Sequence, residues 1–334
     1  MNWFLDLAGL TRPQVNDLLA RANTLDRFPA PDALRGRILT LLLLKPSFHT
    51  RASMEAAMAR LGGRTITIAP ALDGWQIETG TEVVMDGHTA HHARELIPAM
   101  AAYSDVLGIR APGSYSSLGA DLKETAFASL SQTCNIPLIN LESALNHPCQ
   151  SLADWKTLDD LNVPGRGGRI VLSWSANPQG HPLAMPAATI HMAAMRGMRV
   201  TVLRPDEFAL PAPVLLKAQK AGAQSGGSVT ETSDRDRAMD GAHVLYAESW
   251  IAPQYYQNPD KEQALRARYT DWCVDERWFK RAQETAAFFH TLPLRRGVGV
   301  TDDVMDGPRS QVIAQSRNRM LVQMAILHRM LADS

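Results

Sequence analysis

The sequence has few cysteines, and those it has are not paired in spacing. Its 334 residues include Cys134, Cys149 and Cys273, which form neither a disulfide framework nor a structural zinc signature. Such cysteine usage is typical of a reducing compartment. Residues 1–6 also lack the basic and apolar regions of a secretory signal peptide. We therefore expect a cytoplasmic protein.

Long apolar runs and an excess of charge are missing as well. No stretch approaches the roughly 18 apolar residues of a membrane-spanning helix. The 34 Lys and Arg residues balance 34 Asp and Glu residues, so no overall field attracts nucleic acid or a membrane surface. An anionic substrate would have to be bound by a local group of donors, and we expect neither nucleic acid nor membrane as a partner.

Short apolar runs alternate with amphipathic segments along the chain. We expect strands at residues 38–44, 65–68, 106–110, 136–140, 169–174, 198–203 and 244–246, with further candidates at 270–274 and 286–290. Helices are expected at 11–27, 52–61, 97–103, 125–133, 150–161, 182–196, 211–223 and 310–331. This alternation predicts an α/β fold of two domains, each a parallel sheet flanked by helices, linked by interdomain helices.

The first long apolar run leads directly into a helix through Lys45-Pro46-Ser47-Phe48-His49-Thr50-Arg51. A strand-to-helix turn presents backbone N–H groups and the positive end of the helix dipole. Here it also carries two hydroxyls and two cations, which predicts a phosphate site. The alternative is that Ser47 is only an N-cap and Arg51 only a solvated helix residue.

Three further motifs favour the phosphate interpretation. Arg110 ends a short apolar run, which is where a strand delivers a side chain to a cleft. His147-Pro148-Cys149-Gln150 follows another such run and opens an expected helix. His290-Thr291-Leu292-Pro293-Leu294-Arg295-Arg296 comes late in the chain, with a proline beside two arginines.

In this order and spacing, these motifs resemble those of the aspartate/ornithine carbamoyltransferase family. Within that family the chain is most similar to N-acetylornithine carbamoyltransferases. The closer likeness rests on Asp73-Gly74-Trp75, Val84-Met85-Asp86-Gly87, Cys149, Leu294-Arg295-Arg296, Thr301-Asp302, Val304-Met305-Asp306 and Asn318-Arg319. It covers nearly the whole chain.

The resemblance implies transfer of the carbamoyl group of carbamoyl phosphate to the amine of an ornithine-like or N-acylated amino acid. The products would be a ureido compound and phosphate, with arginine biosynthesis the most economical setting. Residues 1–149 with 310–334 would bind carbamoyl phosphate, and residues 150–309 the second substrate. No metal or cofactor is implied, because the departing phosphate can itself accept the amine's proton.

The resemblance also assigns site residues. Carbamoyl phosphate would be held by Ser47, Phe48, His49, Thr50, Arg51, Arg110, His147, Gln150 and Arg295. Of these, Arg110, His147, Gln150 and Arg295 would be catalytic, since Arg110 and His147, with Thr50, donate to the developing oxyanion. The second substrate would meet Trp75, Glu142, Glu248, Thr291 and Leu292. The loop at 69–88 would reach a neighbouring subunit within a homotrimer with shared active sites.

His88, His91 and His92 have a spacing that would place them on one face of a helix. A metal site there is imaginable, but no distant carboxylate ligand supports it, and we interpret them as a polar helix face. Cys149, between a proline and a glutamine, is interpreted as structural rather than nucleophilic. The glycines at 165–168 precede a strand, whereas a dinucleotide fingerprint follows one, which disfavours a dehydrogenase.

Four positions depart from the family pattern. His49 replaces the arginine expected in the phosphate turn, and Thr291 the cysteine of ornithine enzymes. Glu248 and Gly299 stand where we expect lysines in the acetylornithine enzymes. The second substrate could therefore be a more cationic amine paired with Glu248 or Glu142. Alternatively, Glu248 points to solvent and Arg295, Arg296 and the 69–88 loop rebuild the pocket. A carbamoyltransferase for a different amine and a binding paralogue with little or no turnover also remain open.

Overall fold

The computed structural model describes residues 1–80 and 82–332 and divides into two compact units. Unit 1 consists of Met1–Gly113, Gly119–Ala153 and Arg317–Ser334, and unit 2 of Ser114–Leu118 and Asp154–Ser316. Helices α7 (Pro148–Asp160) and α13 (Val312–Leu331) each begin in one unit and end in the other. The predicted α/β fold, with a parallel sheet in each part and helices that link them, is confirmed.

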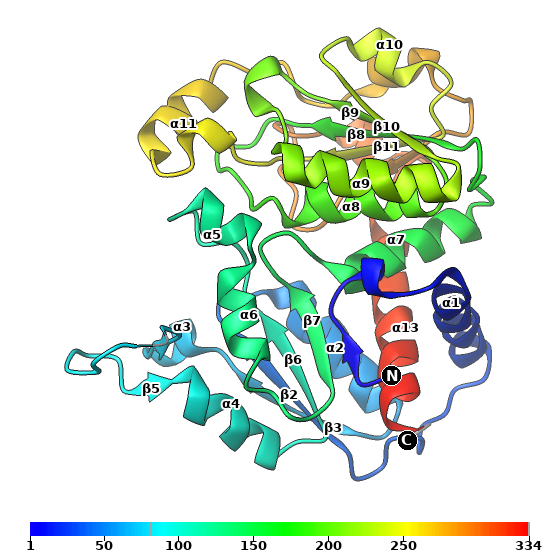
Figure 1. Cartoon of the computed structure of the whole chain (residues 1–334). Coiled ribbons are helices and arrows are strands. Elements are labelled where there is room, and N and C mark those ends of the chain that lie inside the picture. Colours follow the sequence, from blue (N-terminus) through cyan, green and yellow to red (C-terminus); the bar gives the residue numbers. More distant parts are fainter. Residues whose placement is uncertain (81, 333–334) are drawn as a thin grey trace. The chain divides into compact units, whose positions relative to one another are not determined.

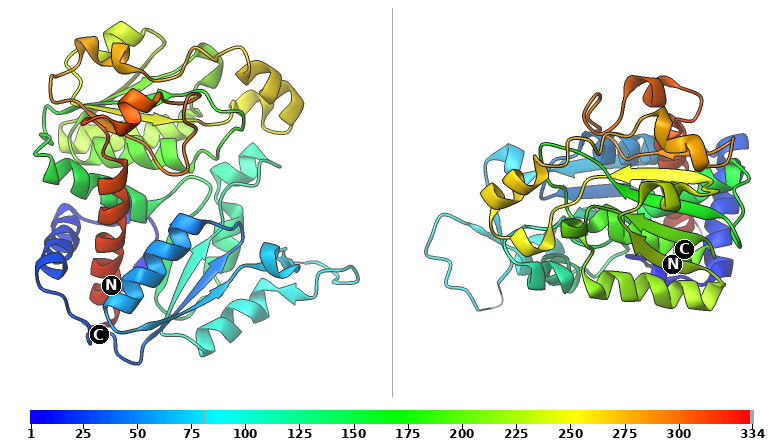
Figure 2. Two further views of the ribbon diagram at one scale, coloured as in Figure 1. Left: turned by 180° about the vertical axis from the view of Figure 1, so that it is seen from behind. Right: turned by 90° about the horizontal axis from the view of Figure 1, so that it is seen from above.

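Unit 1 is built on a five-stranded parallel sheet in the order β1-β7-β6-β2-β3. The strands are β1 (Trp3–Phe4), β7 (Leu138–Glu142), β6 (Val106–Arg110), β2 (Ile38–Leu43) and β3 (Arg64–Ile68). The helices are α1 (Arg12–Arg27), α2 (Phe48–Arg60), α4 (Ala93–Ala102), α5 (Leu118–Leu122) and α6 (Thr125–Ser131). Figure 1 shows α4 and α6 against one face of this sheet, and Figure 2 shows α2 with the end of α13 against the other.

Local sequence explains these elements. β2 reads Ile-Leu-Thr-Leu-Leu-Leu, and its buried residues suit a central strand covered on both faces. Helix α1 begins with a capping box, in which Thr11 and Gln14 bond each other's backbone and side chain. Apolar residues of α4, α6, β6 and β7 then form one cluster that includes Ile97, Ile109 and Leu130. The carboxyl ends of β2 and β6 are therefore held by a packed core.

Unit 2 contains a second five-stranded parallel sheet in the order β10-β9-β8-β11-β12. Its strands are β8 (Arg169–Trp174), β9 (Arg199–Leu203), β10 (Ser228–Thr232), β11 (Val244–Glu248) and β12 (Ala287–Phe289). Helices α8 (Ala184–Met195) and α9 (Ala212–Ser225) lie side by side over one face (Figure 1). The other helices of this unit are α10 (Arg235–Met239), α11 (Pro259–Arg266) and α12 (Asp302–Asp306), with 3-10 helices at Asp206–Phe208, Pro253–Tyr255 and Glu276–Arg281. A further 3-10 helix, Leu7–Gly9, belongs to unit 1.

One expected strand is absent, and one strand at a sheet edge was not predicted. Residues 270–274 form no strand, and Val274 makes only an isolated bridge to Val300. Trp272 and Val274 are apolar because they are buried in a turn-rich segment. Conversely, β10 was not predicted. It lies at the sheet edge and has one buried apolar residue, Val229, so its apolar signal is weak.

The three histidines do not share a helix face, so that interpretation was wrong. His91 and His92 form the short strand β5, and α4 begins only at Ala93. His92 is the N-cap of α4, because its side chain accepts a hydrogen bond from the Arg94 N–H. Within residues 1–80 and 82–332, no group of three metal-ligating side chains could hold a metal ion.

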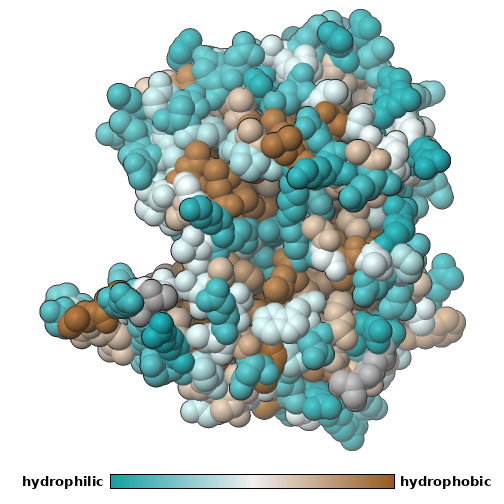
Figure 3. Space-filling model, viewed as in Figure 1, coloured by the Kyte–Doolittle hydropathy of each residue, from teal (hydrophilic) through white to brown (hydrophobic). Residues whose placement is uncertain are grey.

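A segment between β4 (Ile77–Glu78) and β5 (His91–His92) projects from unit 1, preceded by the one-turn helix α3 (Pro70–Asp73). Val83, Val84 and Met85 are exposed on it, and Figure 3 shows hydrophobic surface at its tip.

No helix in the described parts of the chain is long and apolar enough to cross a membrane.

Candidate functional site

The turn after β2 begins α2 with Ser47 as its N-cap. Ser47 Oγ accepts a hydrogen bond of 3.3 Å from the Thr50 N–H. Arg51 is exposed and pairs with Glu55 at 2.9 Å, one helical turn later. Phe48 is 77% exposed, whereas Thr50 is buried. Both features of the alternative interpretation, a cap and a solvated arginine, are therefore present, and neither prevents this helix start from binding an anion.

An arginine from the far end of the chain lies behind this turn. Arg319 Nη2 in α13 donates to Thr50 Oγ1 at 2.7 Å, and Nη1 lies 3.4 Å from Gln150 Oε1. All three side chains are buried within unit 1. A guanidinium only donates, so the Thr50 oxygen must accept this bond and its own hydrogen remains available to another acceptor. The sequence indicates no role for Arg319, because its place in a long amphipathic helix gives no sign of a partner 269 residues away.

Arg110 is held at the end of β6 by a buried carboxylate. Its Nε and Nη2 lie 2.9 and 2.6 Å from Glu142 Oε2, and its Nη1 donates to the Lys45 carbonyl oxygen at 2.6 Å. Glu142 was predicted to meet the second substrate, but in unit 1 it lies against Arg110. The Lys45 Nζ donates to the Gly113 carbonyl, and burial, followed by the charge of Arg110, lowers the pKa of Lys45.

His147 is buried next to the same carboxylate, with Nε2 at 3.9 Å from Glu142 Oε2. Burial first, and then the charges of Arg319 and Arg110, hold the pKa of His147 well below its ordinary value. The contact with Glu142 is thus not an ion pair. His147 Nδ1 has no hydrogen-bond partner among the described residues. A neutral imidazole in this setting is suited to donate one hydrogen bond to a ligand.

Burial also shifts the pKa values of His49 and Cys149. Partial burial, followed by the charge of Arg319, lowers the pKa of His49. Complete burial raises the pKa of Cys149 to about 12. The thiolate that a nucleophile requires is therefore scarce at neutral pH, in line with a structural role for Cys149.

Unit 2 presents a second polar group at the carboxyl end of its sheet. Glu248 ends β11, and its Oε1 accepts hydrogen bonds from Thr291 N, at 3.1 Å, and from Thr291 Oγ1. Its side chain is 2% exposed, so the alternative that Glu248 points to solvent is wrong. The charge of Glu248 acts on His181, although burial is the larger effect and lowers the pKa of His181. Burial also lowers the pKa of His290 to about 4, so this histidine stays neutral.

The two late arginines behave differently. Arg296 is engaged by Asp302 and Asp306 at 2.8 and 2.6 Å. Arg295 is exposed, and within residues 1–80 and 82–332 no side chain or backbone group pairs with it, although its charge reaches His181. Leu292 and Thr291 are half-buried beside them.

Gly299 is buried and packed against backbone. A Cβ atom at this position would lie 2.9 Å from the Ala176 carbonyl oxygen, closer than real Cβ atoms approach. The lysine expected here in acetylornithine enzymes would therefore require the backbone to move.

Trp75 in unit 1 is half-buried and contacts His91, with ring centroids 4.7 Å apart.

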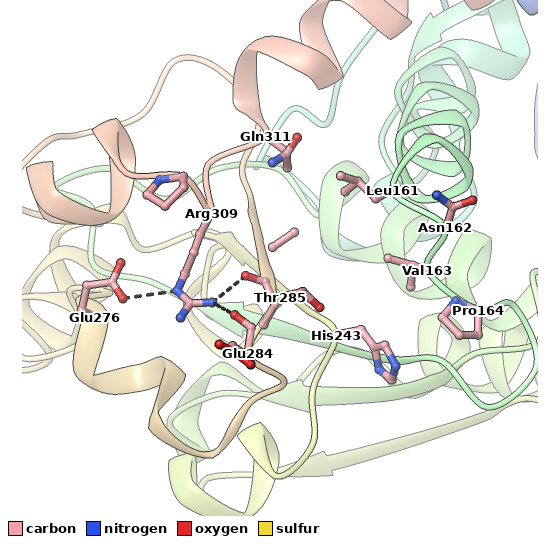
Figure 4. A pocket seen from close by; sticks show the side chains of 13 residues that line it. Leu161, Asn162, Val163, Pro164, His243, Glu276, Glu284, Thr285, Arg309 and Gln311 are labelled. Atoms are coloured by element: carbon pink, nitrogen blue, oxygen red, sulfur yellow. Dashed lines mark hydrogen bonds and ion pairs between the residues drawn. The ribbon is translucent and has the colours of Figure 1, made fainter.

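A cavity of about 620 Å³ lies elsewhere, at the amino ends of β11 and β12. Figure 4 shows Arg309 on one side of it, paired with Glu276 and bonded to the Glu284 carbonyl. His243 and Asn162 lie across from them. The predicted site residues are absent from its lining, so this cavity is separate from the two polar groups described above.

Comparison with known proteins identifies the family of the chain. Residues 3–160 match the carbamoyl-phosphate-binding domain of aspartate/ornithine carbamoyltransferases, and residues 185–330 match their aspartate/ornithine-binding domain. The chain belongs to the aspartate/ornithine carbamoyltransferase family. The predicted family and the predicted carbamoyltransferase activity are confirmed.

Three relatives illustrate how close the resemblance is. N-acetylornithine carbamoyltransferase of Xanthomonas campestris pv. campestris is 34% identical, over 99% of this chain and 98% of its own. N-succinylornithine carbamoyltransferase of Bacteroides thetaiotaomicron is 29% identical, over 92% and 91%. The crystal structure of acetylornithine transcarbamylase with acetylcitrulline is 33% identical, covers 99% of both chains and superposes with a TM-score of 0.94. The chain is a carbamoyltransferase of the ornithine and N-acylornithine group.

Proposed function

We propose that this carbamoyltransferase acts on an acceptor with a free ammonium group where N-acylornithines carry a neutral amide, which makes ornithine itself the first candidate. The observation that carries the proposal is the buried Glu248 carboxylate at the carboxyl edge of the unit 2 sheet. In open parallel sheets, ligands bind outside the carboxyl ends of the strands. A carboxylate there stabilises a cation and repels another carboxylate.

Thr291 holds the Glu248 carboxylate in place. It donates to this carboxylate from both its backbone N–H and its hydroxyl. The nearby His290 is buried and stays neutral. An acceptor ammonium could pair with the Glu248 carboxylate, whereas a neutral N-acyl group could not.

We assign the first substrate to the polar group of unit 1. The N–H groups at the start of α2, with the Ser47 and Thr50 hydroxyls and Arg51, would hold the phosphate. Arg110, fixed by Glu142, would donate to the carbonyl oxygen together with His147 and Thr50. Such preorganised donors stabilise the oxyanion of the tetrahedral intermediate. Gln150 would orient the carbamoyl NH2, and Arg295 would complete the phosphate or carbonyl contacts.

Arg319 joins this set as a residue that positions two others. Its bonds fix the Thr50 oxygen as an acceptor and hold the Gln150 amide. The departing phosphate would accept the proton of the attacking amine, so this scheme assigns no step to Cys149.

We further propose a homotrimer with shared active sites, acting in the cytoplasm. The exposed Val83, Val84 and Met85 support an interface, because hydrophobic side chains gathered on a projecting segment are typical of surfaces that a partner covers. The three cysteines are all free thiols, which fits a reducing compartment. Arginine biosynthesis would be the setting of an ornithine-type acceptor.

The acceptor is tested by incubating the protein with carbamoyl phosphate and one amine at a time: ornithine, N-acetylornithine, N-succinylornithine, aspartate, putrescine and agmatine. Mass spectrometry should detect the carbamoyl adduct of ornithine and at most traces of the two N-acyl adducts. Glu248→Gln should reduce kcat/KM for ornithine more than tenfold, chiefly by raising KM. Preference for an N-acylornithine would refute the role of Glu248, and carbamoyl-phosphate binding without any adduct would favour a binding paralogue.

A further inference from the structure

A cluster of arginines on the unit 2 sheet lies far along the strands from the residues assigned to the substrates. It sits at the amino ends of β8, β9 and β10, whereas Glu248 and Thr291 lie at the carboxyl end of the sheet. A cavity of about 310 Å³ is found there, lined entirely by unit 2 residues. Its walls include Arg169, Arg199 and Arg237.

Strand register brings two of these cations together. Arg169 of β8 is directly opposite Arg199 of β9, and Arg199 is opposite Ser228 of β10. Like charges directly opposite each other on neighbouring strands destabilise a sheet. The adjacent residues Ile170, Val200 and Val229 alternate to the other face and are buried, so the two arginines share the face that α8 and α9 leave uncovered.

The remaining walls add donors and little negative charge. Thr201 and Thr230 form the next row of the same face, and both carry hydroxyls. Arg237 comes from α10, and Asp240, which follows α10, is the cavity's one acidic side chain. The carboxylate of Asp240 already pairs with Arg281 at 3.2 Å, and its carbonyl accepts from Arg169 Nη1 at 2.7 Å.

Among the described residues, two of the three guanidinium groups have no partner. In the parts of the chain that the structure describes, no hydrogen bond or ion pair involves the side chain of Arg199 or Arg237. Guanidinium forks bind phosphate and carboxylate oxygens in pairs. An anion between the strands and α10 would neutralise the repulsion between Arg169 and Arg199 and accept bonds from the neighbouring hydroxyls.

We propose that this cavity binds a small polyvalent anion, a diphosphate or a polycarboxylate, separately from both substrates. The size of the cavity and its surroundings favour a small ligand over nucleic acid. The chain as a whole has no net charge, and Asp234 and Asp236 flank the arginines on the α10 side. The nearby aspartates and the zero net charge make an extended polyanion a poor fit.

The test is titration calorimetry of pyrophosphate, and in parallel of citrate, into the intact protein at low ionic strength. Arg51→Gln is used as the background, because it weakens the phosphate turn of unit 1. In that background we expect one pyrophosphate or citrate bound per chain. Arg199→Gln and Arg237→Gln should each weaken that binding at least tenfold, and stronger binding of one of the two probes identifies the ligand class.

A matched control is Lys220→Gln, which removes one exposed positive charge from α9, the helix over the other face. It should leave the binding unchanged. Without anion, Arg199→Gln should melt no lower than the parent protein, since it removes a repulsive pair, and it should lose the rise in melting temperature that pyrophosphate gives. Absence of binding in the Arg51→Gln background, or equal binding by the arginine variants, would overturn the proposal.

Discussion

Replacing His49 with arginine should strengthen carbamoyl-phosphate binding at alkaline pH. The imidazole lies at the start of α2, where a phosphate would meet it, and its pKa is lowered by partial burial and by Arg319. Because this pKa lies below its ordinary value, His49 is largely neutral at pH 8. The wild-type turn therefore lacks one cation at pH 8, which an arginine would keep at every pH.

The expected gain follows from the strength of one charge-assisted hydrogen bond. Such a bond contributes about 1.5–3 kcal/mol, and because His49 is partly exposed we expect the lower end. This corresponds to roughly tenfold tighter binding at pH 8. The bound phosphate raises the pKa of the imidazole, so the wild type takes up a proton on binding and its affinity falls as pH rises. The advantage of His49→Arg should shrink toward pH 6.

Titration calorimetry at pH 6, 7 and 8 measures both quantities. The ratio of the two affinities at each pH removes the ligand's own titration. Measurements in two buffers of different ionisation enthalpy count the protons taken up, which should be a fraction of one for the wild type and close to none for His49→Arg. His49→Gln, neutral throughout, should bind weakly with a pH-independent ratio to His49→Arg. A wild-type to His49→Arg ratio that stays constant from pH 6 to 8 would refute the reasoning.

Three other substitutions probe the buried polar groups. Arg319→Gln should weaken carbamoyl-phosphate binding about tenfold, because the Thr50 hydroxyl loses its charged donor. It should also raise the pKa of His49, so that the loss of affinity with rising pH occurs at a higher pH. An unchanged pH profile would contradict this. Asp154→Ala should cost about 3 kcal/mol in urea unfolding, since the Tyr246 hydroxyl, now 2.9 Å from Asp154, loses its buried acceptor; a loss below 1 kcal/mol would contradict it. Cys149→Ala should keep most activity, and the wild-type Cys149 thiol should resist iodoacetamide at pH 8, as its pKa of about 12 requires.

The sequence was sufficient for most of the fold because apolar periodicity reports burial directly. The run from Ile38 is a central strand, and the segment after Ser47 is a helix with a capping side chain. Apolar periodicity misleads where a buried segment does not pair in a sheet, and where a paired strand buries little. Trp272 is buried without a ladder, and β10 pairs at an edge with little to bury.

The site was harder to predict than the fold, because its geometry depends on contacts between distant segments. Motifs drew attention to Arg110 and His147, and a departure from the family pattern drew attention to Glu248. They did not reveal that Glu142 holds Arg110, or that Arg319 reaches Thr50 across most of the chain. Side chains that act through other side chains leave no local pattern, since neither partner is near the other in sequence.

The close approach of Gly299 to the Ala176 carbonyl limits the order in which a lysine could be introduced at position 299. A lysine introduced at 299 by itself would meet main-chain atoms before it met any ligand. The same substitution would be tolerated only after the segment around Ala176 had shifted. An engineering route that places a lysine at position 299 should therefore remodel the segment around Ala176 first and substitute Gly299 last.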